Sequence, residues 1–173
     1  MAATAARLSA EPGGDGAVIF VTVGTTMPFD ELFVEVDRLA GAGLLGEPVI
    51  CQTGQSAYRM QHAEQFAGRP SIDDLIAEAS LVVSHGGATV LQLLRAEKPF
   101  VAFPNPRGAG DHQTSFLRQA QSIADVSWSS DVTDLERLLA ERRAKGAARV
   151  DSSIPRAGPQ ILAALGRGRG YMS

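Results

Sequence analysis

A glycine-rich segment stands out among the residues that could bind a phosphorylated ligand. His85-Gly86-Gly87-Ala88-Thr89 follows an apolar run and precedes a helical pattern. Its glycines would let a ligand approach the main chain, and free N–H groups where a helix begins favour a diphosphate. The segment matches neither GxGxxG nor a P-loop, which disfavours NAD and ATP phosphates. The alternative is a tight strand–helix turn with no ligand.

Two further segments offer groups that suit the rest of such a ligand. Gly24-Thr25-Thr26 provides close approach and two hydroxyls, although these could equally cap the next helix. Asp111-His112-Gln113 follows a glycine-rich loop and opens a helical pattern. A neighbouring carboxylate and carboxamide suit vicinal sugar hydroxyls, because together they accept and donate hydrogen bonds. Here too the alternative is structural, with Asp111 as a helix N-cap.

Alternating strands and helices must position these segments. Short β-branched apolar runs predict buried strands, and 3.6-residue periodicity predicts the helices between them. This order predicts an α/β domain with a Rossmann-like parallel sheet and flanking helices. Ligands bind such sheets at the carboxyl ends of the strands, which is where all three segments fall. The predicted strands are 17–23, 48–53, 81–84, 100–103 and 126–128, and the predicted helices are about 29–41, 71–79, 88–94, 112–124 and 133–146.

Composition indicates one soluble globular domain. The 173 residues are 45% hydrophobic and 20% charged, and the net charge of −3 gives no reason to expect nucleic acid as a partner. A single cysteine, Cys51, excludes an internal disulfide and favours a cytoplasmic location. The longest apolar run is far below the about 20 residues that a membrane span requires, and no signal peptide is recognisable. We therefore expect any membrane association to come through a partner.

We expect the chain to consist of three parts. Residues 1–16 are rich in alanine and glycine and are expected to be mobile. Residues 17–146 form the ligand-binding domain, in which we expect Trp128 to pack in the core. Residues 147–173 form a C-terminal segment with one helix, around 159–165, and a flexible end. The segment either packs on this domain or contributes to an interface.

Taken together, the motifs resemble a known family. The chain is similar to the donor-binding C-terminal domain of family 28 glycosyltransferases, which have the GT-B architecture. It resembles in particular the stand-alone versions of that domain. These are the PssE-like glucuronosyltransferase subunit of exopolysaccharide synthesis and the catalytic subunit of the two-part N-acetylglucosaminyltransferase of lipid-linked oligosaccharide synthesis. The resemblance covers about residues 18–128, in family order, and rests on residues 20–26, 29–30, 52–54, 81–87, 98–99, 104 and 111–113.

The resemblance implies roles for individual residues. The family often has a ribose-binding glutamate where this chain has Gln92, and a further glycine where Ala88 runs directly to Thr89. These departures leave the register of Thr89 and Gln92 open. His85 and His112 could act as a general base, or could instead orient the loops. The implied donor-binding set is Gly24, Thr25, Thr26, His85, Gly86, Gly87, Ala88, Thr89, Gln92, Asp111, His112 and Gln113.

The resemblance also implies a function. We expect the donor-binding subunit of a two-component hexosyltransferase, moving a sugar from a UDP-sugar to a lipid-linked acceptor in exopolysaccharide synthesis. A membrane-anchored, acceptor-binding subunit would recruit it to the inner face of the membrane. No cofactor or metal is expected. The resemblance does not determine which sugar is transferred, although Arg107 could pair with the carboxylate of a uronate. The alternative is a non-catalytic nucleotide-sugar-binding or scaffolding subunit. The sequence has no Gly-x-Ser-x-Gly motif, which disfavours a hydrolase.

Overall fold

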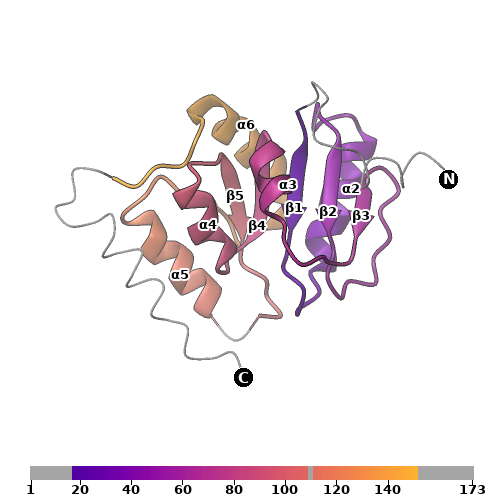
Figure 1. The fold of residues 1–173 in the computed structure, drawn as a ribbon, viewed down its shortest axis with the longest axis horizontal. Coiled ribbons are helices and arrows are strands. Elements are labelled where there is room, and N and C mark those ends of the chain that lie inside the picture. The colour runs from indigo at the N-terminus through magenta and orange to yellow at the C-terminus, as the bar shows by residue number, and fades with distance from the viewer. Residues whose placement is uncertain (1–16, 109–110, 152–173) are drawn as a thin grey trace.

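A computed structural model describes residues 17–108 and 111–151. These residues form a six-stranded parallel sheet in the order β3-β2-β1-β4-β5-β6, with flanking helices (Figure 1). The predicted Rossmann-like α/β fold is thereby confirmed. The expected mobile segment 1–16 and the helix expected around 159–165 lie outside the described residues. The elements are β1 (Ile19–Thr22), α2 (Asp30–Gly41), β2 (Val49–Gln52), β3 (Glu64–Phe66), α3 (Asp73–Glu78), β4 (Leu81–His85), α4 (Thr89–Arg95), β5 (Phe100–Phe103), α5 (His112–Gln121), β6 (Ser127–Trp128), the 3₁₀ helix η1 (Val132–Asp134) and α6 (Leu135–Lys145).

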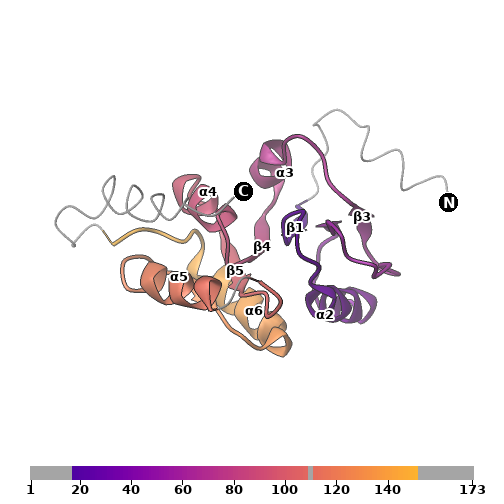
Figure 2. The same ribbon diagram turned by 90° about the horizontal axis from the view of Figure 1, so that it is seen from below.

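Helices cover both faces of the sheet. Alternate strand residues point to opposite faces, so Val21 packs against α2 and α6, whereas Phe20 packs against α3, α4 and α5. Figure 2 shows α2 and α6 on one side of the sheet and α3 and α4 on the other. Because the central strands are buried on both faces, their residues form the continuous apolar runs that the sequence shows.

One strand was not predicted. The edge strand β3 is three residues long, polar in part, and half-buried throughout. It carries neither an apolar run nor a clear alternation, and main-chain pairing with β2 defines it. Its side-chain pattern therefore gives no indication of a strand.

Several boundaries and placements also differ from prediction. The helix expected to reach Ala124 ends at Gln121, and Ala124 instead forms an antiparallel bridge with Val150. Trp128 packs against the core but is half-buried at the sheet edge, with its indole N–H donating to Gln121. The helix expected to follow Ser71 begins at Asp73, whose N–H donates to the Ser71 hydroxyl.

Within the described residues, no helix is long and apolar enough to cross a membrane.

Candidate functional site

A pocket of about 360 Å³ lies at the carboxyl ends of the first strands and is here named the strand-end pocket. Residues from the loops after β1 and β3 contribute to it, together with the ends of β1 and β2 and one side of α4. Glycine and hydroxyl residues predicted from two separate motifs therefore meet in one hollow. Its lining residues are Thr22, Gly24, Thr25, Gln52, Arg69, Pro70, Ser71, Ile72, Asp73, Thr89 and Gln92.

The His85 ring lies between two of the predicted glycines. A Cβ atom on Gly24 would lie 3.3 Å from His85 Cε1, and one on Gly87 would lie 2.3 Å from His85 Nε2. Gly24 also has a φ of +76°, a conformation that L side chains rarely adopt. The loops after β1 and β4 thus close around one imidazole, and a side chain at Gly87 would displace it.

Burial of His85 controls its charge. Loss of solvent lowers the pKa of His85, and the main chain of Thr22 offsets this only in part. Its Nδ1 atom is buried and has no well-formed hydrogen bond within the described part of the chain. A neutral ring can present a lone pair or an N–H to a ligand.

Two other glycines are explained by close packing behind the pocket. Gly54, with a φ of +55°, approaches the main chain of the β1 loop so closely that a Cβ would lie 2.6 Å from the carbonyl oxygen of Gly24. A Cβ on Gly86 would lie 2.9 Å from Leu117 Cδ1 and 3.0 Å from Gln113 Cβ. The β4 loop is therefore packed directly on α5.

The rim formed by α3 and α4 carries a carboxylate. The Gln92 side-chain amide donates to Asp73 Oδ1, and the Ser71 hydroxyl donates to Asp73 Oδ2 at 2.9 Å. Arg69, beside them, forms an ion pair with Asp74. Gln92 is thus hydrogen-bonded to the Asp73 carboxylate, and these two side chains together could bind the hydroxyl groups of a ligand.

The loop after β5 is held by its own hydrogen bonds. The buried Asn105 donates from its side chain to the Pro28 carbonyl at 3.1 Å, and its main-chain N–H donates to Gln113 Oε1 at 2.7 Å. Arg107 forms a two-pronged ion pair with Glu31, at 2.8 and 2.9 Å. Gln113 and Arg107, considered above for sugar recognition, both have protein partners.

The predicted site residues fall into three groups. Gly24, Thr25, Thr89 and Gln92 line the strand-end pocket; His85, Gly86, Gly87 and Gln113 pack beside it. The remaining members of the set are exposed and do not line it: Thr26, Ala88, Asp111 and His112.

Seven pocket residues were absent from the predicted set, among them Gln52, Arg69 and Asp73. Gln52 carried a signal, because it ends a predicted strand. Arg69 and Asp73 follow the unpredicted β3, and without that strand their position at the same sheet edge could not be inferred.

His62 lies elsewhere on the domain. It packs on Gly41 at the end of α2, with Nδ1 3.4 Å from Asp37 Oδ1. Among the described residues, no three His, Cys, Asp or Glu side chains are grouped so as to hold a metal ion.

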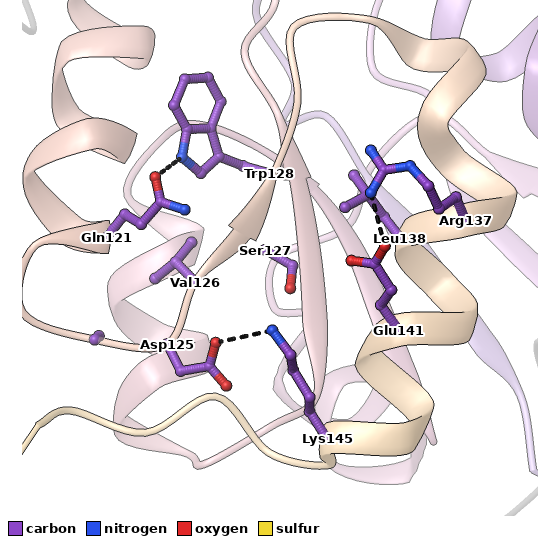
Figure 3. Close-up of a pocket in the computed structure, with 10 residues that line it drawn as sticks. Gln121, Asp125, Val126, Ser127, Trp128, Arg137, Leu138, Glu141 and Lys145 are labelled. Carbon is purple, nitrogen blue, oxygen red and sulfur yellow. Dashed lines mark hydrogen bonds and ion pairs between the residues drawn. The ribbon is translucent and has the colours of Figure 1, made fainter.

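A second pocket, also of about 360 Å³, lies beside the edge strand β6 and is here named the edge pocket (Figure 3). Gln121, Asp125, Trp128, Arg137 and Lys145 are among its lining residues. It contains none of the predicted site residues.

Comparison with known proteins identifies the family. Residues 18–141 match the Glycosyltransferase family 28 C-terminal domain. The chain belongs to this family. A curated relative, the UDP-N-acetylglucosamine--N-acetylmuramyl-(pentapeptide) pyrophosphoryl-undecaprenol N-acetylglucosamine transferase of Hydrogenovibrio crunogenus, is 35% identical over 109 residues. That match covers 54% of this chain and 29% of the relative.

Solved structures share the fold at low sequence identity. MurG of Acinetobacter baumannii superposes with a TM-score of 0.51 at 17% identity, covering 90% of this chain and 51% of that one. The glycotransferase of kitacinnamycin gives a TM-score of 0.56 at 19% identity, covering 91% of this chain and 40% of that one. This family 28 domain therefore spans about half or less of these proteins.

Proposed function

We propose that the strand-end pocket binds the nucleotide diphosphate of a UDP-sugar. The supporting observation is that residues from the β1 loop and from α4, namely Gly24, Thr25, Thr89 and Gln92, line one pocket in a family 28 domain. Among the described residues, no partner accepts from or donates to the hydroxyls of Thr25 and Thr89. Those groups are free for phosphate or sugar oxygens.

We further propose that this chain is the donor-binding subunit of a two-component glycosyltransferase. The name of a curated relative includes a lipid-linked acceptor. A second, membrane-anchored subunit would supply the acceptor site and the catalytic base, and would recruit this chain to the inner face of the membrane. Exopolysaccharide synthesis is the proposed setting, on the resemblance to PssE-like subunits.

The proposed reaction is the transfer of a sugar from the diphosphate to an acceptor hydroxyl. An acceptor hydroxyl attacks the anomeric carbon of the sugar, the bond to the diphosphate breaks, and UDP leaves with the electron pair. Main-chain N–H groups near Gly86 and Gly87, with His85 beside them, would stabilise the negative charge that develops on the diphosphate. The acceptor proton passes to a base on the partner. His85 serves as a diphosphate-binding group in this scheme.

Calorimetric titration of the full chain with UDP, ADP and GDP tests the donor site. We expect heat of binding with UDP and much weaker binding of ADP and GDP. If the full chain binds none of these three nucleotides at millimolar ligand concentration, the proposal is contradicted.

A sugar-transfer assay distinguishes the two-component enzyme from a non-catalytic nucleotide-sugar-binding subunit. UDP release from a UDP-sugar is measured with the chain alone, with the co-purified membrane subunit alone, and with both. Turnover only with both supports the two-component enzyme. Retained UDP binding without turnover in the complete complex supports a non-catalytic nucleotide-sugar-binding subunit, which the replacement of the family glutamate by Gln92 also favours.

A further inference from the structure

A buried polar pair forms the floor of the strand-end pocket. Thr22 and Gln52 are register partners at the ends of β1 and β2. Thr22 is fully buried and Gln52 is 4% exposed, yet both line the pocket. The Thr22 hydroxyl donates to Gln52 Oε1 at 2.6 Å.

This hydrogen bond determines which atom of the Gln52 amide faces the ligand. Thr22 Oγ1 accepts from the Gly24 N–H at 3.4 Å, so its own O–H is available to donate to Gln52 Oε1. The Nε2 group then has no acceptor among the described residues. Because Gln52 lines the pocket, its Nε2 group is available to an oxygen acceptor of a bound ligand.

The surroundings of Gln52 suit a flat ring that carries oxygen acceptors. Gly68 faces Nε2, and even a Cβ there would lie 3.8 Å away, so no side chain from that position screens the amide. Pro70 and Ile72 add apolar surface to the pocket lining, and Arg69 adds further N–H donors. His85 lies across β1 from Gln52, because β1 separates β2 from β4 in the sheet. The diphosphate and the base would therefore occupy opposite sides of Gly24.

We infer that Gln52, held in one orientation by Thr22, donates a hydrogen bond from Nε2 to the 4-carbonyl oxygen of the nucleobase. A pyrimidine-2,4-dione such as uracil satisfies this donor. Cytosine presents an amino group in place of the 4-carbonyl, and two donors would then face one another. Gln52 is a specificity-determining residue and Thr22 is its positioning residue. This inference rests on the proposed binding of a nucleotide diphosphate in the same pocket.

The test is a matched titration of the full chain with UDP and with CDP, which differ only at the base. We expect the wild-type chain to prefer UDP by about tenfold or more, as for one well-placed hydrogen bond. Gln52→Leu removes the donor, so we expect UDP affinity to fall while CDP affinity changes little. Thr22→Val keeps the shape of the side chain but frees the amide to rotate, so we expect the preference to shrink towards unity.

Thr22→Ser is the matched control, because it retains the hydroxyl and should retain the preference. Thermal unfolding of each variant establishes that it is folded, and the two Thr22 variants test the idea independently of Gln52→Leu. Equal affinities of the wild-type chain for UDP and CDP would overturn the inference while leaving the proposed function intact. A Gln52→Leu variant that weakens both ligands equally would overturn it too, because the amide would then contact the diphosphate or ribose. Binding of neither nucleotide by the wild-type chain would overturn both.

Discussion

The strand-end pocket and the edge pocket have the same volume, about 360 Å³, but differ in how their polar groups are used. In the edge pocket every charged lining side chain has an oppositely charged partner, as in Arg137 with Glu141 and Lys145 with Asp125 (Figure 3). In the strand-end pocket, the Thr25 and Thr89 hydroxyls and the Gln52 Nε2 group have no hydrogen-bond partner among residues 17–108 and 111–151. Available donors, rather than volume, distinguish the proposed ligand site from a structural hollow.

The largest effect is expected behind the edge pocket. Arg142 is fully buried and donates to the Asp125 carbonyl at 2.8 Å and to Ser127 Oγ at 2.6 Å. We expect Arg142→Ala to lower the free energy of unfolding by about 3 kcal/mol, because it leaves a cavity and unpaired polar groups. Urea denaturation measures this, with exposed Lys145→Ala as the control that changes stability by less than about 1 kcal/mol. UDP affinity of folded Arg142→Ala should be unchanged, and its loss would break the distinction between the two pockets.

The second effect concerns the glycine that faces His85. A Cβ at Gly87 would lie 2.3 Å from His85 Nε2, so the ring must move to accommodate Gly87→Val. We expect UDP affinity to fall about 100-fold, equivalent to about 2.7 kcal/mol, as measured by calorimetry. Thr26→Val is the control, because Thr26 is exposed and does not line the pocket. If the two variants bind UDP equally well, the ligand does not contact the β4 loop.

A smaller effect is expected for His85 itself, and it should depend on pH. Burial lowers the pKa of His85, so the ring is neutral in the free chain near pH 7. A bound diphosphate would raise that pKa, and binding would then take up a proton. We expect His85→Ala to weaken UDP binding about tenfold at pH 7. The ratio of wild-type to variant affinity should grow as the pH falls towards 6, and a ratio that stays constant would show that the ring does not titrate with binding.

The smallest effect returns to the edge pocket. Burial raises the pKa of Asp125, but Arg142 and Lys145 outweigh it and lower the pKa below the ordinary value. Asp125 therefore contributes stability above its unfolded-state pKa, and that contribution is lost as the pH falls through the lower folded-state pKa. Because Asp125 is half exposed, we expect Asp125→Asn to cost about 1 kcal/mol or less at pH 7. Unfolding curves for the two proteins should converge in strong acid. A stability gap that persists there would assign the effect to packing.

Local pattern predicted most of this fold. The runs that became β1, β4 and β5 are apolar on both faces, and burial on both faces of a parallel sheet requires such composition. The glycine turns after β1 and β4 were also predictable, because each ends a strand and precedes a helix. β3 was not, since its three residues are half-buried and lack a side-chain pattern.

The sequence by itself therefore determined the order of the main elements and the sheet edge at which the glycine motifs meet. Only the tertiary structure decided which polar groups stay available at that edge. Strand register pairs Thr22 with Gln52, and packing of α5 brings Gln113 Oε1 to the Asn105 N–H. Backbone conformation and hydropathy act over a few neighbouring residues and leave a local pattern. Hydrogen-bond partners depend on contacts between distant segments, which no local pattern records.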